Sequence, residues 1–313
     1  MLRSFLLRAL PSLAFMSALA AFTADATAAS EIDQHLRDAY QNKTFVLRGF
    51  YPGTSLRFDS AGSPPAGTPP GDWAVNGFVQ VEDIRLAGGR LKIRASRLHL
   101  GWTHDGLKPL HDFIGKDKPD KDERKTRSLQ IEADLGPETV TTEIADAALS
   151  RIFLTPQDRL ADLVPDYWKP CISDGLVGKG NSCHFPPEFA SIPGVALPAN
   201  ADAEPSTTST GTAASSGPIF RMPKGVSPPK VTSQHEPEFS DPARLAKFQG
   251  TMTLGLLVDT SGVPTNIHIL SPLGCGLDEK AVRAVQGWRF RPAEKDGRPV
   301  AVEIAAEVDF PLY

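Results

Sequence analysis

Three histidines lie within a short stretch of the chain and could together hold a metal ion. His99, His104 and His111 carry imidazole rings, which are the commonest metal ligands in proteins. None of them is paired with an acid at the i, i+4 spacing that places two ligands on one helix face, and His99 and His104 flank the predicted end of a strand. We expect surface or capping roles for these histidines, with a metal or catalytic role as the alternative.

Other motifs that carry enzyme chemistry are missing from the sequence. The chain has no G-x-S-x-G elbow, no H-E-x-x-H pair and no phosphate-binding glycine loop. The acidic cluster of Asp117, Asp120 and Asp122 lacks the central glycine and the closing glutamate of an EF-hand calcium loop, so its segment, 115–127, is predicted to be a solvated hairpin tip. We expect a protein that is not an enzyme and holds no cofactor or metal.

The N-terminus has the pattern of an export signal. Arg3 and Arg8 give it a positive front, an apolar stretch covers 9–24, and small residues end at Ala28. This pattern predicts a signal peptide over 1–28, cleaved after Ala28 or close to it. The alternative is an uncleaved membrane anchor, although the apolar stretch falls short of the roughly 20 residues that span a bilayer.

Export determines how the cysteines are interpreted. Cys171 and Cys183 lie close together in a glycine- and proline-rich segment, and in an oxidising compartment such a pair most simply forms a local disulfide. Closing so short a loop would contribute roughly 3 kcal/mol to stability. A zinc site with His184 as third ligand is the rival interpretation, but zinc usually takes four ligands. Cys275 remains, and we expect it to be a small buried thiol.

Composition divides the exported chain into two folded units. The sequence has 313 residues, is 41% hydrophobic and 22% charged, and carries a formal charge of −4, which suits globular domains and gives no basic footprint for nucleic acid. Residues 29–190 are predicted to form a β-rich domain and 236–313 a second, smaller unit. Between them, 191–235 is rich in Pro, Ala, Ser, Thr and Gly and is predicted to be a disordered linker.

The first unit begins with a predicted short helix over Glu31–Tyr40 and continues with several strand patterns. In "RLKIRASRLHLGW" the residues Leu91, Ile93 and Ala95 share one phase while Leu98, Leu100 and Trp102 share the other; such a shift indicates a bulge or a change of sheet face. "RSLQIEADL" is predicted to be a strand and "TEIADAALSRIF" a helix. "LVPDYWKPC" is expected to be extended, with its aromatic rings on the sheet.

The second unit has the clearest local patterns. "GTMTLGLLVD" and "VPTNIHIL" alternate apolar and polar residues on either side of a turn over Asp259–Gly262, which predicts a β-hairpin. A helix follows, ending near Gly287. Its apolar residues recur at helical spacing with Asp278 in the first turn, where the helix dipole favours negative charge. The expected structural residues of this unit are Asp259, Gly262, Leu277, Asp278, Ala281, Val285, Trp288, Phe290, Pro292 and Gly297.

After a turn at Asp296-Gly297, "PVAVEIAAEVDF" alternates over its whole length. This pattern predicts one long strand with a dry face and a wet face. The dry face would consist of Val300, Val302, Ile304, Ala306, Val308 and Phe310, and the wet face would carry Glu303, Glu307 and Asp309. The predicted fold class is therefore α+β, with a β-rich N-terminal domain and a small C-terminal antiparallel sheet covered by a helix.

The motifs of this last unit occur together in one order. They are a P-x-F opening before a short helix, a G-x-V/M-x-L strand ending in Asp, a D-x-x-G turn, an L-D-x-x-A-x-x-A-V helix, a W-x-F-x-P-A stop and a final alternating strand after D-G-x-P-V. From about Glu236 onward, over about a quarter of the chain, the sequence resembles the C-terminal domain of TonB-family energy transducers. The N-terminal domain resembles no family that we recognise.

This resemblance implies a partner and a mode of binding. Proteins of the family bind an extended segment of an outer-membrane transporter by strand addition beside their last strand, which matches Val300 to Phe310 here. The residues expected to form the partner-binding strand are Val300, Val302, Glu303, Ile304, Glu307, Val308 and Phe310. A plainer interpretation is that this strand is an edge protected by its acidic residues.

The sequence also departs from the family. The transducers begin with a membrane helix whose Ser/His pair faces motor proteins of the inner membrane, whereas this N-terminus has no histidine before His35 and has a cleavable pattern. An inner-membrane motor is therefore an expected partner only if the N-terminus stays uncleaved. The expected location is the periplasm or cell envelope. Two alternatives remain: an enzymatic N-terminal domain that the C-terminal unit localises, and an adaptor that forms homodimers through sheet edges.

Overall fold

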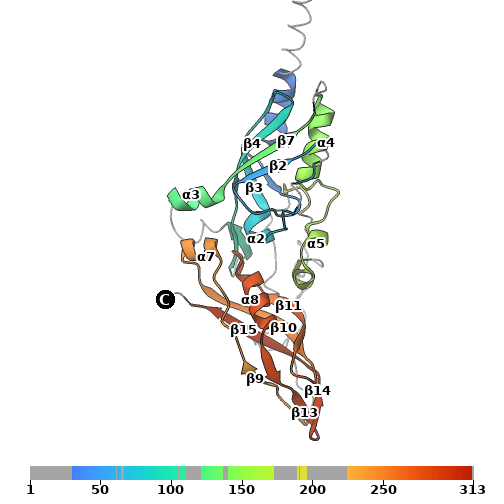
Figure 1. The fold of residues 1–313 in the computed structure, drawn as a ribbon, viewed down its shortest axis with the longest axis vertical. Coiled ribbons are helices and arrows are strands. Elements are labelled where there is room, and N and C mark those ends of the chain that lie inside the picture. The colour runs from blue at the N-terminus through green and yellow to red at the C-terminus, as the bar shows by residue number, and fades with distance from the viewer. Residues whose placement is uncertain are drawn as a thin grey trace, which may run out of the picture.

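The structure is a computed structural model, shown in Figure 1, and it describes 30–60, 62–64, 67–103, 106–109, 121–136, 140–172, 189, 191–195 and 224–311. The predicted signal peptide and most of the predicted linker lie outside these residues. Among the described residues, no helix is both long and apolar enough to cross a membrane.

The N-terminal unit is built on a five-stranded sheet. Its strands are β1 (Thr44–Val46), β2 (Ser55–Phe58), β3 (Phe78–Ala87), β4 (Arg90–Arg97) and β7 (Ser128–Asp134), in the order β1-β3-β4-β7-β2. Only the pairing of β2 with β7 is parallel. The helix over 30–40 and the strand β7 confirm the sequence predictions for these segments.

One face of this sheet is covered by α4 (Thr142–Ile152), the predicted helix. Thr141 accepts a hydrogen bond from the backbone N–H of Ile144 and so caps the first turn. The buried residues Ala145, Ala148, Leu149 and Ile152 join one hydrophobic cluster with the inward side chains of β3, β4 and β7. Burying an apolar helix stripe on an apolar sheet face is the main stabilising contribution here.

The shift of phase after β4 marks the place where the chain leaves the five-stranded sheet, whereas a bulge or a change of sheet face was predicted. Leu100–Thr103 forms β5, which pairs with β6 (Gly106–Pro109) in a separate two-stranded sheet. The short helix α2 (Trp73–Asn76) lies nearby and is capped by Asp72, whose Oδ1 accepts from the N–H groups of Ala74 and Val75. Figure 1 shows α2 between the large sheet and the C-terminal unit, and the aromatic side chains of Trp73 and Trp102 join a cluster with residues of that unit.

Two predictions for the N-terminal unit were wrong. The segment Lys121–Arg127 forms a helix, α3, because Lys, Glu and Arg are good helix formers and basic residues in its last turn favour the helix dipole. "LVPDYWKPC" is helical rather than extended, since it follows α5 (Leu160–Leu163) and contains the 3₁₀ turn η2 (Asp166–Trp168) and α6 (Lys169–Ile172). Pro165 precedes η2, where its fixed φ suits a helix start.

The C-terminal unit contains three small antiparallel sheets. The first has the order β11-β10-β15, from β10 (Gly250–Val258), β11 (Pro264–Ser271) and β15 (Val302–Phe310). The second joins β12 (Arg289–Arg291) to β9 (Lys230–Ser233), and the third has the order β14-β13-β8, from β8 (Val226–Ser227), β13 (Ala293–Lys295) and β14 (Arg298–Val300). The helices α7 (Asp241–Ala246) and α8 (Leu277–Gln286) complete the unit.

Most of the predicted elements of this unit are present, with two differences. The hairpin and the helix have the predicted bounds, and Gly287 is the C-cap of α8. The predicted single last strand is divided at Ala301 into β14 and β15, which join different sheets. The end of the predicted linker is also structured, because β8 and β9 pair with β13 and β12.

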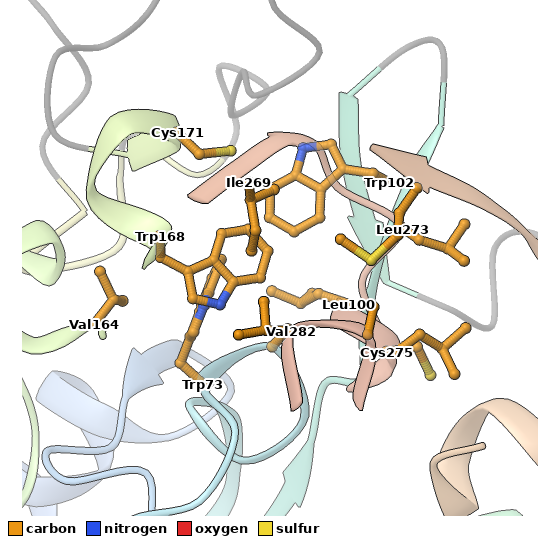
Figure 2. Close-up of a cluster of buried hydrophobic side chains, with 14 of the residues drawn as sticks. Trp73, Leu100, Trp102, Val164, Trp168, Cys171, Ile269, Leu273, Cys275 and Val282 are labelled. Carbon is orange, nitrogen blue, oxygen red and sulfur yellow. The ribbon is translucent and has the colours of Figure 1, made fainter. Parts of the chain in front are cut away.

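A hydrophobic core is shared by the two units. Trp73, Trp102 and Trp168 of the N-terminal unit lie in one cluster with Ile269, Leu273 and Val282 of the C-terminal unit, as Figure 2 shows. The three indole rings contact one another, with centroids 5.1 Å apart for Trp73 and Trp168, 5.4 Å for Trp102 and Trp168, and 5.8 Å for Trp73 and Trp102. The aromatic rings predicted to lie on the N-terminal sheet therefore pack between the units.

Candidate partner-binding edge of the C-terminal sheet

The strand β15 lies at the end of its sheet. It pairs with β10 over its full length in an unbroken register, from Val258 opposite Val302 to Gly250 opposite Phe310. Within the described part of the chain, no strand pairs with its other side. An end strand offers a row of unpaired main-chain N–H and C=O groups to an incoming strand.

The side chains of β15 follow the predicted alternation. Val302, Val308 and Phe310 are buried, and Ile304 and Ala306 are half-buried. The residues between them, Glu303, Ala305, Glu307 and Asp309, are exposed. The dry and wet faces of the predicted strand are thus present. Val300, which was expected in the same strand, lies in β14 instead, because the chain leaves the sheet at Ala301.

The direction of each main-chain group in β15 can be derived from its neighbour β10. The N–H of Asp259 donates to Val263 and the carbonyl of Leu257 accepts from the Thr265 hydroxyl, so both groups point toward the β11 side. Successive residues of a strand point to opposite sides, and Val258 therefore points toward β15. Since the register is unbroken, even-numbered residues of β15 bond to β10 and odd-numbered ones present their N–H and C=O groups outward.

The turn between β10 and β11 is held by Asp259. Its Oδ1 accepts from the N–H groups of Ser261 and Val263 at 2.8 and 2.9 Å and from the Ser261 hydroxyl at 2.7 Å. The Ser261 hydroxyl is the main cause that lowers the pKa of Asp259. Gly262 has a φ of 82°, and the N–H of Phe290 donates to its carbonyl at 2.9 Å. The bonds of Asp259 hold the turn together, and the bond from Phe290 joins the hairpin tip to β12.

The helix α8 is anchored by its predicted apolar residues and by a buried acid. Leu277, Ala281 and Val285 are fully buried, and the indole of Trp288 donates to the carbonyl of His235 at 3.1 Å. Asp278 is also fully buried and accepts from the N–H of Leu273 at 2.8 Å and of Gly274 at 2.5 Å. Burial is the largest cause that raises the pKa of Asp278 to about 7.

The remaining structural residues lie around the β13–β14 hairpin and β12. Phe290 is buried in β12, Pro292 is half-buried between β12 and β13, and Gly297 has a φ of 75° in the turn after β13. Each predicted structural residue of the C-terminal unit thus lies in a described element or turn.

The predicted metal candidates are not brought together among the described residues, where no group of three His, Cys, Asp or Glu side chains could hold a metal ion. His99 is buried, and burial with the charges of Arg127 and Arg97 lowers its pKa to about 3. His104, His111, His184, Asp117 and Asp120 lie outside the described residues. Cys183 does too, so the disulfide with the buried Cys171 stays a prediction.

Three residues at the contact between the units carry no signal in the sequence that predicts their role. The indole N–H of Trp168 donates to Glu279 Oε1 at 2.8 Å, and Asp72 faces the same helix end. These residues are far apart in the sequence and carry no local pattern that would join them. The one related prediction was that the aromatic rings of "LVPDYWKPC" are buried, and these rings do lie at the contact between the units.

Residues 235–312 match the family described as Gram-negative bacterial TonB protein C-terminal. The C-terminal unit is a TonB C-terminal domain. The Protein TonB of Vibrio cholerae is 35% identical over 103 residues, which cover 32% of this chain and 42% of that protein. The chain thus spans less than half the length of this curated relative, and the N-terminal unit remains unassigned.

Solved structures of similar chains are also known, one of them as follows. The solution NMR structure of the Pseudomonas aeruginosa TonB CTD is 19% identical, covers 29% of this chain and 89% of that chain, and superposes with a TM-score of 0.24. The strand β15 is the last strand of the TonB C-terminal domain in this chain, and it is therefore the element to which the expected strand addition applies.

Proposed function

We propose that this protein works in the cell envelope, where the TonB C-terminal domain captures an extended segment of an outer-membrane transport protein. The observation that carries the proposal is the outer side of β15, which presents the main-chain groups of Glu303, Ala305, Glu307 and Asp309. An extended peptide would pair with these groups as a further antiparallel or parallel strand.

The two faces of β15 would give this pairing its selectivity. On the dry face, Ile304 and Ala306 are half-buried and would contact apolar side chains of the incoming strand. On the wet face, Glu303 and Glu307 would favour basic or polar neighbours across the strands, since opposite charges in cross-strand pairs are stabilising. The preferred segment is therefore amphipathic, with a basic side.

Energy transduction is a narrower form of this proposal, supported by the similarity to Protein TonB. It requires that the N-terminus remain in the inner membrane, where a motor complex could act on it. The mass of the N-terminal peptide of protein isolated from the envelope tests this form: a start near Ala29 would exclude it, and an intact Met1 in the inner-membrane fraction would support it.

The test of strand addition uses proline at two adjacent positions. Ala305→Pro removes an outward N–H, which an edge strand tolerates, whereas Ala306→Pro removes a bond to β10 and should destabilise the sheet. Ala305→Gly keeps the N–H and is the matched control. Full-length variants would be titrated with synthetic peptides from the periplasmic N-terminal segments of outer-membrane transporters of the same organism.

We expect Ala305→Pro to keep the wild-type circular dichroism spectrum and to bind the peptides about two- to tenfold more weakly, because each lost main-chain hydrogen bond costs about 0.5–1.5 kcal/mol. Ala305→Gly should bind like the wild type. Equal binding by both variants would exclude this edge as the site. If instead the full chain dimerises and Ala305→Pro abolishes the dimer, a second copy of the chain occupies the edge.

A further inference from the structure

Two carboxyl groups, one from each unit, meet in the contact between the N-terminal unit and the TonB C-terminal domain. Asp72 caps α2, and Glu279 lies in the first turn of α8. Both line a cleft of about 450 Å³ between these elements. A Cβ atom placed on Gly276, at the start of α8, would lie 3.1 Å from Asp72 Oδ2, which puts this oxygen directly against the C-terminal unit.

Each carboxyl group uses one oxygen for a defined hydrogen bond. Asp72 Oδ1 accepts from the N–H groups of Ala74 and Val75 at 2.7 and 3.2 Å. Glu279 Oε1 accepts from the indole of Trp168, which belongs to the N-terminal unit, at 2.8 Å. The other two oxygens, Asp72 Oδ2 and Glu279 Oε2, are fully buried, and neither has a hydrogen-bond donor among the described residues.

Two ionised carboxylates in this arrangement would be strongly unfavourable. Both groups would carry a charge out of water, they would repel each other, and two buried acceptor oxygens would lack a donor. A single proton shared by Asp72 and Glu279 leaves one buried charge in place of two, removes the repulsion and supplies a donor, because the protonated acid donates to the ionised one. Each of the two side chains also shifts the pKa of the other, which fits two carboxyl groups that lie close together.

The neighbouring charged groups do not supply the missing donor. From α8, Lys280 pairs with Glu238 at 2.8 Å, Arg283 lines the cleft, and Asp278 accepts from two backbone N–H groups. From η2 and α7, Tyr167 and Asp241 line the cleft as well. Burial is the largest cause that raises the pKa of Glu279 well above its ordinary value, and it also raises the pKa of Asp72.

We propose that Asp72 and Glu279 form a proton-dependent latch, which holds the N-terminal unit against the TonB C-terminal domain when one proton is shared and loosens as that proton is lost. The inference does not depend on what binds to β15. The latch would allow the two units to act as one body under acidic conditions and to separate as the pH rises.

The direction of the effect follows from linkage. The pKa of the carboxyl group is higher in the closed state than in the open state. Its contribution to the closed state is therefore fully present when the pH is below the ordinary pKa of Glu, about 4.3. The contribution is lost as the pH rises from that value to the raised pKa. For one linked proton, the equilibrium for opening should shift by about tenfold per pH unit within that window. Above the window the shift should stop.

Opening can be measured at Cys275. This cysteine is fully buried in the contact, and its backbone N–H donates to the carbonyl of Leu100 across the units at 2.6 Å. The full-length protein would be treated with a thiol reagent between pH 5 and 8, and labelling of Cys275 would be quantified by peptide mass spectrometry. The thiol itself reacts faster as the pH rises. To remove this effect, the labelling rate of Cys275 in the wild type is divided by the rate in the Glu279→Gln variant at the same pH.

The matched variants are Glu279→Gln and Asp72→Asn. In Glu279→Gln the amide can donate to Asp72 Oδ2 while its oxygen still accepts from Trp168, so the closed state needs no proton. Asp72→Asn can still cap α2 and can donate to Glu279 Oε2. Asp162→Asn changes an exposed carboxyl on α5 and is the control.

We expect the ratio of wild-type to Glu279→Gln labelling to rise with pH by about tenfold per unit within the window. Asp162→Asn should behave as the wild type and Asp72→Asn as Glu279→Gln. A constant ratio between pH 5 and 8 would overturn the proposal. Should Glu279→Gln fail to fold, the ratio of wild-type to Asp72→Asn labelling tests the latch in its place. The measurement does not involve a peptide, so a failure of peptide binding at β15 would leave its result unchanged.

Discussion

The two outer strands of the C-terminal sheet differ in what lies beside them. On the β11 side, the chain continues into Leu273, whose carbonyl accepts from the N–H of Trp102 at 2.8 Å, and β11 also contacts η2 and α6 of the N-terminal unit. On the opposite side, β15 has no neighbouring strand among the described residues. One edge of the sheet is therefore closed by the chain itself and the other is open.

Proteins protect sheet edges either by covering them or by placing charge on them. The β11 edge is protected because it is covered: three tryptophan rings and the apolar residues around them exclude water from this side of the sheet. The open edge uses Glu303, Glu307 and Asp309. Burial removes an edge from further binding, whereas charge leaves its main-chain groups accessible. This difference indicates why a partner strand is expected at β15 and not at β11.

The largest effect is expected from breaking the closed edge at Trp168. Its side chain is fully buried between Trp73, Trp102 and the C-terminal unit. Trp168→Ala should lower the free energy of unfolding by about 3–5 kcal/mol, since it removes a large buried ring and leaves a cavity. Denaturant unfolding followed by circular dichroism measures this loss.

Leu163→Ala is the control for Trp168, because Leu163 lies on α5 with 39% of its surface exposed. It should change stability by no more than about 0.5 kcal/mol. If Trp168→Ala were as mild as this control, the tryptophan cluster would not hold the units together, and the closed edge would be no more protected than the open one.

A smaller effect is expected at the turn that joins β10 to the closed edge. Gly262 and Gly297 have similar positive φ values, 82° and 75°, so alanine strains the backbone equally at both. A Cβ on Gly262 would lie 1.9 Å from the carbonyl oxygen of Phe290, whereas a Cβ on Gly297 would have no atom within 4 Å. Only the first substitution also forces the hairpin away from β12.

Gly297→Ala should therefore destabilise the protein by about 1–2 kcal/mol and Gly262→Ala by about 3 kcal/mol or more. Thermal unfolding of both full-length variants compares them directly. If both variants lost the same amount of stability, the contact between the Gly262 turn and β12 would contribute nothing measurable to stability. Asp259 would then be the residue that holds the hairpin tip.

The elements of the TonB C-terminal domain could be predicted because their signals are local. Alternation over "GTMTLGLLVD" and the helical spacing of Leu277, Ala281 and Val285 each follow from residues a few positions apart. The sequence did not predict the division at Ala301, since the alternation continues across it. The direction of the backbone changes there without a change in the pattern of polar and apolar residues.

The contact between the units could not be predicted, because it joins residues that are far apart in the sequence. Asp72 follows a run rich in Pro and Gly and has the pattern of a loop residue, and Glu279 has the pattern of an acid in a first helical turn. Each has an adequate local explanation as a cap or a dipole partner. Only the three-dimensional structure places the two carboxyl groups together.

The smallest effect on stability is expected at the open edge. Glu307 is exposed in β15, and its main-chain groups point outward. Glu307→Val should change the free energy of unfolding by no more than about 0.5 kcal/mol, because an exposed side chain with no tight partner contributes little. Valine also favours strands, so the edge itself should remain intact.

The same substitution should nevertheless increase self-association, since it removes a charge that keeps two copies of β15 from pairing. Glu294→Val is the matched control: Glu294 is also exposed but lies in β13, the middle strand of its sheet, which pairs with a strand on either side. Sedimentation velocity over a range of concentrations should show dimers for Glu307→Val only. Dimers of both variants would point to general surface hydrophobicity, and the acids of β15 would then lose their role as protection of an edge kept open for a partner.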